Sequence, residues 1–217
     1  MFNTIVFDLD GTLLDTLDDL HNAVNEALRF FNLPLRTKEE VCAFVGNGIQ
    51  TLISRAIGEE NQNLLQPTLA KFIEFYKAHC QEKTAPYEGI LELLRLLKGL
   101  GVKTAVLSNK ADFATKMLVE KYFAGYIQEA MGENEAAGIR KKPAPDALFR
   151  LMEKLGASKE KTVYVGDSDV DILTAKNAGL ACISCTWGFR SEAFLKEHGA
   201  NMIVNSPLEI LAFCEEK

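Results

Sequence analysis

Polar side chains that could do chemistry follow several short apolar runs in this sequence. They are Asp8, Asp10, Gly11 and Thr12 after residues 4–7, Ser108 and Asn109 after residues 102–107, Asp167 and Asp171 after residues 162–165, and Lys142 in a loop with Pro143 and Pro145. If the apolar runs are parallel strands, these groups meet at one edge of a sheet, because ligands of open α/β sheets bind beyond the carboxyl ends of the strands. Carboxylates, hydroxyls and a cation gathered there can hold a divalent metal and a phosphate.

The carboxylates predict the metal site. Asp8 and Asp10 lie two residues apart at a strand end, where extended backbone points both side chains the same way. Two such carboxylates repel each other unless a cation neutralises them, and hard oxygen ligands suit Mg²⁺. Asp167 arrives from another strand end and is the natural third contributor. Each aspartate alone could equally be a helix N-cap, so the prediction depends on their convergence.

The other groups suit a phosphate. A turn at Gly11 and Thr12 would expose backbone N–H groups to an anion. Ser108, with Asn109 beside it, could donate its hydroxyl to a phosphate oxygen, and Lys142 would add a positive charge. Ordinary alternatives exist for each feature: a strand-to-loop turn, a cap on the next helix, and a solvated surface lysine.

Asp171 lies four residues beyond Asp167. At that distance it could orient Lys142 or a metal-bound water rather than bind the metal itself.

The elements that must position these groups alternate along the chain. Runs rich in β-formers occur at residues 4–7, 102–107, 162–165, 181–184 and, more weakly, 202–204, and helical patterns follow them. This alternation predicts an α/β fold, a Rossmann-like parallel sheet core with helices on both faces.

Residues 16–84 interrupt the alternation with helical periodicity and no convincing strand. Thr16 followed by Asp19 resembles a helix N-terminus, with a Thr cap and an acidic residue in the first turn. We therefore expect a small all-helical cap domain over residues 16–84, inserted after the first strand of a core formed by residues 1–15 and 85–217.

Composition excludes several classes of protein. The 217 residues are 47% hydrophobic, enough for a real core, and the formal charge of -6 argues against nucleic acid as a partner. No apolar run approaches the roughly 18 residues that span a bilayer, and the first residues do not resemble a signal peptide. We expect a cytoplasmic protein without a membrane partner, whose oligomeric state the sequence leaves open.

The five cysteines fit reduced, structural thiols better than a disulfide framework. Cys182 and Cys185 have the spacing of a metal or redox pair, but they lie in a predicted strand that would aim the two sulfurs at opposite faces.

At these residues the chain resembles the haloacid dehalogenase superfamily over nearly its whole length. Asp8 to Thr12 match that family's first motif, Ser108 its second, Lys142 its third, and Asp167 with Asp171 its fourth. The helical insertion lies where the family has a cap. Within the family, Val45-Gly46-Asn47-Gly48 and Trp187-Gly188-Phe189-Arg190 are most similar to the phosphoglycolate phosphatase branch.

The resemblance implies a mechanism. Asp8 would attack phosphorus to form an aspartyl-phosphate, and Asp10 would protonate the leaving oxygen and then activate water. Mg²⁺ would be held by Asp8, Asp167 and the main-chain oxygen of Asp10. The cap would bring Gly46, Asn47 and Gly48 over the leaving group of a small phosphorylated metabolite.

Two other functions compete with this one. A phospho-accepting receiver module also gathers acidic residues, a hydroxyl and a lysine at strand ends, but it would not turn over. A sugar phosphomutase of the same superfamily would share the core and the cap, but would pass the phosphoryl group to a sugar instead of water.

Overall fold

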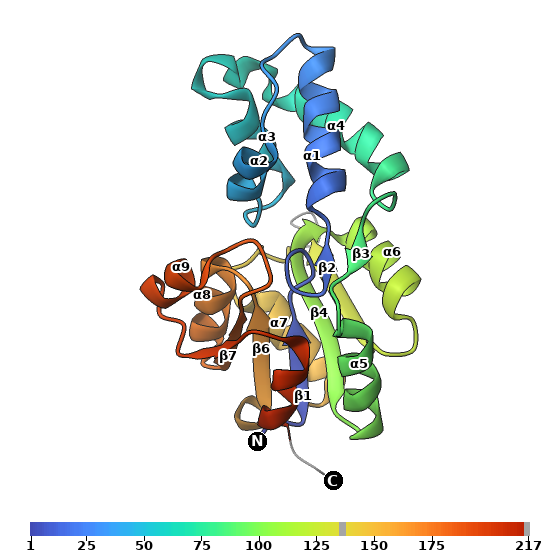
Figure 1. Cartoon of the computed structure of the whole chain (residues 1–217), viewed down its shortest axis with the longest axis vertical. Helices are drawn as coiled ribbons and strands as arrows, with labels where there is room; N and C mark the ends of the chain where they lie inside the picture. The colour runs from blue at the N-terminus through green and yellow to red at the C-terminus, as the bar shows by residue number, and fades with distance from the viewer. Residues whose placement is uncertain (135–137, 215–217) are drawn as a thin grey trace. The chain divides into compact units, whose positions relative to one another are not determined.

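A six-stranded sheet with the order β5-β4-β1-β6-β7-β8 forms the centre of the first of two units in the computed structural model (Figure 1). The structure describes residues 1–134 and 138–214. Its strands are β1 (Thr4–Phe7), β4 (Lys103–Ala111), β5 (Glu129–Glu133), β6 (Thr162–Gly166), β7 (Ala181–Cys185) and β8 (Met202–Val204). All neighbouring strands pair in parallel, and β1 lies between β4 and β6. The predicted α/β class and parallel sheet are confirmed.

Strand β5 was absent from the sequence prediction. Its residues, Glu129 to Glu133, include a glycine and no β-branched side chain, so local propensity disfavours a strand. It forms at the sheet edge against β4, where α6 (Asp112–Phe123) also packs. Gly132 donates its N–H to Asp112 Oδ1 at 3.0 Å, and a Cβ there would lie 2.5 Å from the backbone oxygen of Lys110. Tertiary contacts therefore decide this strand.

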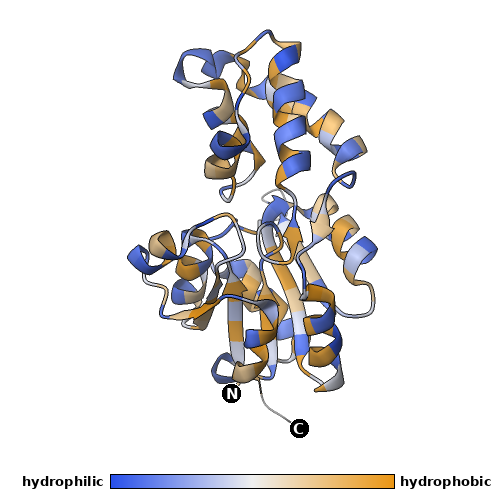
Figure 2. Cartoon of the chain, in the orientation of Figure 1, coloured by the Kyte–Doolittle hydropathy of each residue, from blue (hydrophilic) through white to orange (hydrophobic). Residues whose placement is uncertain are grey.

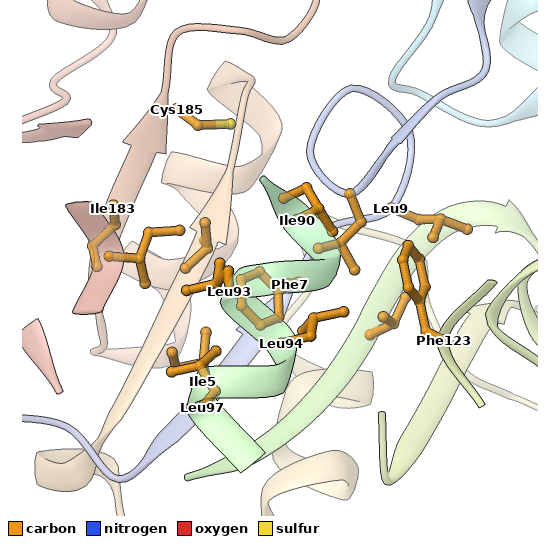
Figure 3. Packing of buried hydrophobic residues seen from close by; sticks show 14 of the residues in the cluster. Ile5, Phe7, Leu9, Ile90, Leu93, Leu94, Leu97, Phe123, Ile183 and Cys185 are labelled. Atoms are coloured by element: carbon orange, nitrogen blue, oxygen red, sulfur yellow. The ribbon is translucent and has the colours of Figure 1, made fainter. Parts of the chain in front are cut away.

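Helices cover both faces of the sheet because strand side chains alternate between the faces. Ile5 and Phe7 of β1 pack with α5 (Ile90–Gly99) and α6, and Figure 3 shows leucines of α5 lying against these two side chains. Val6 between them packs on the other face with α7 (Asp146–Leu155) and α8 (Asp169–Ala178). The helices carry hydrophobic and hydrophilic residues on the same ribbon, as Figure 2 shows. Shorter helices complete this unit: α9 (Glu192–Glu197), η3 (Lys159–Lys161) and η4 (Pro207–Phe213).

The first unit comprises Met1–Leu14 with Pro86–Lys217, and the second, Asp15–Ala85, is helical. The helices of the second unit are α1 (Leu17–Phe30), α2 (Lys38–Phe44), α3 (Ile49–Ile57), η1 (Glu59–Leu64) and α4 (Leu65–His79). The buried side chains of α1 include Leu20, Val24 and Leu28, which recur with the helical period that the sequence indicates. The two chain segments that connect the units pair as a short sheet of β2 (Leu14–Asp15) and β3 (Ala85–Pro86).

The start of α1 differs from the expected cap. Thr16 occupies the N-cap position, but its side chain makes no capping bond, and its buried hydroxyl oxygen has no partner among the described residues. The side chain of Asp19 instead contacts the last residues of the unit in sequence. Its carboxylate accepts hydrogen bonds from the N–H groups of Lys83 and Thr84 and from the Thr84 hydroxyl, at 2.8–3.1 Å. One side chain thus ties the beginning of the unit to its end.

The cysteines are all free thiols. Cys185 packs in the cluster with α5 and α6, whereas Cys182 packs in the cluster on the opposite face of the sheet, as strand alternation predicts. Burial raises the pKa of Cys182 to about 12, so this thiol stays protonated. Within the described ranges, no helix combines the length and apolar character that a membrane crossing needs.

Candidate active site

Three neighbouring strands bring the predicted polar groups together at their carboxyl ends. Asp8 follows β1 directly, and its N–H donates to the carbonyl of Val165 in β6 at 2.8 Å. Asp167 follows β6, and Ser108 belongs to β4. Because β1 lies between the other two strands, residues far apart in sequence meet at this edge.

Lys142 lies between two carboxylates. Its Nζ is 2.9 Å from Asp8 Oδ1 and 2.7 Å from Asp171 Oδ1, and its side chain is 3% exposed. The hydroxyl of Tyr164 lies 3.1 Å from the same Nζ and 3.2 Å from Asp171 Oδ1. The reading of Lys142 as a solvated surface lysine is therefore wrong.

Asp171 uses both of its carboxylate oxygens within the protein. Oδ1 bonds Lys142 and Tyr164, and Oδ2 accepts from the N–H of Ser168 at 3.1 Å and from its hydroxyl at 2.6 Å. Ser168 is the N-cap of α8, so the helix start fixes the carboxylate that fixes the lysine. Asp169 lies in the first turn of that helix.

Asp167 is held from two loops. Its Oδ1 accepts from the Thr12 hydroxyl at 3.0 Å, and its Oδ2 from the N–H of Phe189 at 2.8 Å. The indole N–H of Trp187 donates to the carbonyl of Thr12 at 3.0 Å, which joins the two loops. Gly188 fits only because it lacks a side chain, since a Cβ would lie 2.3 Å from the Gly11 carbonyl oxygen.

Burial, and then crowding, shift the pKa values of two carboxylates in the site. Burial, and then the negative charge of Asp171, raise the pKa of Asp167 to about 7. Burial and Asp171 also raise the pKa of Asp8 well above its ordinary value, although Lys142 opposes the shift. Burial alone would lower the pKa of Lys142, but attraction to Asp171 and Asp8 outweighs it and raises that pKa. Three neighbouring carboxylates therefore face one lysine, and full ionisation of all three would leave an excess of negative charge.

This charge excess makes the site fit a divalent cation. Among the described residues, Asp8, Asp167 and Asp171 bring one carboxylate oxygen each within 4.8 Å of one another. Oxygen donors of this kind suit a hard cation such as Mg²⁺. Asp171 is the least available of the three, because each of its oxygens accepts from two donors, whereas each oxygen of Asp167 accepts from one. Asp8 and Asp167 remain the side chains best placed to bind a metal.

The side chain of Asp10 pairs with a second lysine. Its carboxylate receives Lys110 Nζ at 2.8 Å from Oδ1 and 3.1 Å from Oδ2. Each of the two aspartates thus has a lysine of its own, and a cation shared by both stays a prediction. The metal contact predicted for Asp10 is through its main-chain oxygen, and that contact stays a prediction.

The loop at Gly11 and Thr12 corrects another expectation. The N–H of Gly11 donates to the Leu14 carbonyl at 2.9 Å, and that of Thr12 donates to the Leu9 carbonyl at 3.3 Å. A tight turn satisfies its own donors, so these two groups do not face an anion here. Gly11, at φ +86°, instead leaves room for Asp167, whose Oδ2 would be 2.4 Å from a Cβ at that position.

Asn109 and Ser108 contact different residues. The Asn109 amide donates to the Lys142 carbonyl at 3.1 Å, and its oxygen accepts from the Lys142 N–H at 2.8 Å. The structure therefore shows a side chain that holds the lysine loop, and the predicted substrate contact of Asn109 stays a prediction. Ser108 is buried within β4 and does not cap α6. Its Oγ accepts from the Lys110 N–H at 3.2 Å, which leaves the hydroxyl hydrogen for another acceptor.

Gly46, Asn47 and Gly48 lie in the second unit, between α2 and α3, with Gly48 as the N-cap of α3. Their predicted place over a leaving group stays a prediction.

Sequence reasoning missed Lys110 and Tyr164. Lys110 follows Ser108 by two positions, so strand alternation already placed both on one side of β4. Tyr164 had no such signal, since a tyrosine inside an apolar strand is usually a core residue, and its hydroxyl is identified only by its partners.

Comparison with known proteins defines the class to which this fold and site belong. Residues 5–185 match the family model of haloacid dehalogenase-like hydrolases, and the chain belongs to that family. It is 33% identical to a phosphoglycolate phosphatase of Pseudomonas syringae pv. syringae over 97% of this chain and 79% of that protein. It is 34% identical to a phosphoglycolate phosphatase of Vibrio parahaemolyticus over 95% of this chain and 93% of that protein.

Solved structures agree. A proposed phosphoglycolate phosphatase from Lactobacillus delbrueckii subsp. bulgaricus superposes with a TM-score of 0.93 at 37% identity, covering 100% of this chain and 99% of that one. A predicted phosphoglycolate phosphatase from Haemophilus somnus superposes with a TM-score of 0.88 at 27% identity. The predicted family and its resemblance to the phosphoglycolate phosphatase branch are confirmed, and the chain is a phosphatase-type enzyme.

Proposed function

We propose that this protein hydrolyses a small phosphate monoester through an aspartyl-phosphate on Asp8, with Mg²⁺ as its cofactor. The observation that carries the proposal is the position of Asp8. Its carboxylate is buried at a strand end, 2.9 Å from Lys142 and in one acidic cluster with Asp167. A structural carboxylate in the core would not need two further carboxylates beside it.

Lys142 and Ser108 act on the phosphoryl group in this mechanism. A carboxylate that approaches a phosphate dianion is repelled by roughly 4 kcal/mol for each pair of unit charges at ~4 Å and an effective dielectric of ~20. The ammonium of Lys142, fixed by Asp171 and Tyr164, opposes that repulsion without having to reorganise. The Ser108 hydroxyl donates to a phosphate oxygen.

Asp10 transfers the protons. It gives a proton to the leaving oxygen while Asp8 bonds to phosphorus, and it then removes a proton from the water that hydrolyses the aspartyl-phosphate. One carboxylate therefore makes the covalent bond and the other moves protons. Their separate lysine partners support this division of roles.

Asp8, Asp167 and the main-chain oxygen of Asp10 would hold Mg²⁺. When bound, the ion supplies positive charge against the phosphate oxygens and the acidic cluster. Thr12 and the N–H of Phe189 keep Asp167 oriented for this task.

The substrate we propose to test first is 2-phosphoglycolate, because the curated relatives described above are phosphoglycolate phosphatases. Residues 16–84 would act as the cap, with Gly46, Asn47 and Gly48 facing the leaving group. Free thiols fit the cytoplasmic location expected from the sequence.

Phosphate release from a panel of monoesters that includes 2-phosphoglycolate, measured with and without Mg²⁺, tests the proposal. We expect many turnovers per chain, activity that is lost in excess chelator, and no turnover by Asp8→Asn with an unchanged circular dichroism spectrum. A chain that takes up one phosphoryl group and stops would instead be a receiver module. Conversion of a hexose 1-phosphate to the 6-phosphate would identify a mutase.

A further inference from the structure

The end of β4 directs three consecutive residues to three different parts of the site. In the proposed mechanism the Ser108 hydroxyl donates to a phosphate oxygen. Asn109 holds the backbone of Lys142 through two hydrogen bonds. Lys110 reaches the carboxylate of Asp10, which is 100 residues away in sequence. The first and third residues share one side of the strand, because strand side chains alternate.

The Lys110–Asp10 pair is buried and well defined. The lysine side chain is 2% exposed and the aspartate side chain 13% exposed. One ammonium contacts both carboxylate oxygens, at 2.8 and 3.1 Å, so it restrains the orientation of the carboxylate as well as its position. The lysine backbone is itself anchored, because its N–H donates to Ser108 Oγ and its carbonyl accepts from Thr115 Oγ1 at 3.3 Å.

Burying an ammonium is costly, and a pair of this kind is weak evidence for stability alone, because an apolar pair of similar size is often as stable. A surface lysine could balance the charge of Asp10 at lower cost. The geometry therefore suggests a task that needs this charge at this place.

We propose that Lys110 is a positioning residue that holds the Asp10 side chain in line for both proton transfers: as the protonated acid when it donates to the leaving oxygen, and as the carboxylate when it removes a proton from the attacking water. This inference rests on the proposed function, in which Asp10 transfers those protons. Lys142 is bound to Asp8 and Lys110 to Asp10, so the two lysines serve different halves of the chemistry. Loss of Lys110 should slow proton transfer and leave attack on phosphorus almost unchanged.

The experiment uses p-nitrophenyl phosphate with Mg²⁺, because p-nitrophenolate leaves readily without receiving a proton. Wild type, Lys110→Met, Asp10→Asn and the double variant are compared in rapid mixing. The first turnover reports attack by Asp8, and steady-state phosphate release reports the water step. Acid quenching then measures how much aspartyl-phosphate each variant holds.

For Lys110→Met we expect a first turnover within about 3-fold of wild type and a steady-state rate about 100-fold lower, the usual size of a general acid–base contribution. The variant should therefore release a burst of one equivalent of nitrophenolate and accumulate aspartyl-phosphate. In the Asp10→Asn background the same substitution should change neither rate further, because a residue that acts through Asp10 is non-additive with it.

Lys116→Met is the matched control, since Lys116 pairs with Asp112 on the neighbouring helix α6 and is 59% exposed. It should behave as wild type. If Lys110→Met does not fold, Lys110→Arg keeps the charge and should retain at least about a tenth of the turnover.

The proposal is overturned by a first turnover lost together with the steady state, by an equal loss in the Asp10→Asn background, or by no loss at all. Loss of turnover in a folded Lys110→Arg to the level of Asp10→Asn would also overturn it. In each of these cases an active wild type leaves the proposed function standing. A wild type that releases no phosphate from any monoester would remove both.

Discussion

Lys142 Nζ lies 2.7 Å from Asp171 Oδ1, with side-chain exposures of 3% and 0%. Asp171 is the carboxylate that keeps the lysine in place, while Asp8, on the other side of Nζ, is the proposed nucleophile. The same carboxylate caps α8 together with Ser168, so a helix terminus and a site lysine depend on one side chain.

Asp171→Asn should therefore affect both stability and catalysis. Removing one partner of a buried ion pair typically costs about 3–5 kcal/mol. Lys142 keeps Asp8 as a partner, so we expect a loss of about 3 kcal/mol. Turnover should fall about 10–100-fold, as is usual when a supporting residue is lost. Urea unfolding and phosphate release measure the two effects. Asp146→Asn is the control, because Asp146 pairs with an exposed arginine and should cost about 1 kcal/mol or less.

Gly188→Ala should weaken metal binding without replacing a proposed ligand. A Cβ at Gly188 would lie 2.3 Å from the Gly11 backbone oxygen and 2.4 Å from Asp167 Cβ, so the loop that holds Asp167 must shift. We expect the Mg²⁺ dissociation constant to rise about 10-fold or more, the usual scale for lost support of a ligand. Isothermal titration measures it. Gly99→Ala, where a Cβ meets nothing within 4 Å, should leave the affinity unchanged.

Mg²⁺ should stabilise the folded chain, because it relieves repulsion within the acidic cluster. At 100 times the dissociation constant the stabilisation is about 2.7 kcal/mol, which thermal unfolding can detect. Trp187 is the only tryptophan and bonds the Thr12 carbonyl beside Asp167, so its fluorescence should change on titration. Asp167→Asn should abolish both responses, and retention of either would exclude Asp167 as a ligand.

Asp19→Ala should loosen the end of the helical unit. The carboxylate accepts bonds from two buried or half-buried N–H groups and a hydroxyl, and each unsatisfied donor costs about 1–3 kcal/mol. We expect a loss of about 3 kcal/mol and faster hydrogen exchange at the amides of Lys83 and Thr84. Asp18→Ala, which removes an exposed pair with Lys38, should change neither quantity measurably.

The sequence by itself determined the parallel α/β sheet, the helical insertion and the groups at the strand ends. The sheet and the insertion follow from periodicity, which is a local property of the chain. The gathering of the strand-end groups follows from the rule that parallel strands end at the same edge. Strand β5 was missed because it depends on α6 and β4 rather than on its own residues.

Only the tertiary structure decided how the charges are paired. In the folded chain Asp8 pairs with Lys142 and Asp10 with Lys110. Asn109 bonds the backbone of Lys142, and the N–H groups of Gly11 and Thr12 bond carbonyls within their own turn. Spacing along the chain can bring carboxylates and lysines to one edge of a sheet. Which of them meet depends on hydrogen bonds and burial over separations of up to 175 residues, as between Thr12 and Trp187.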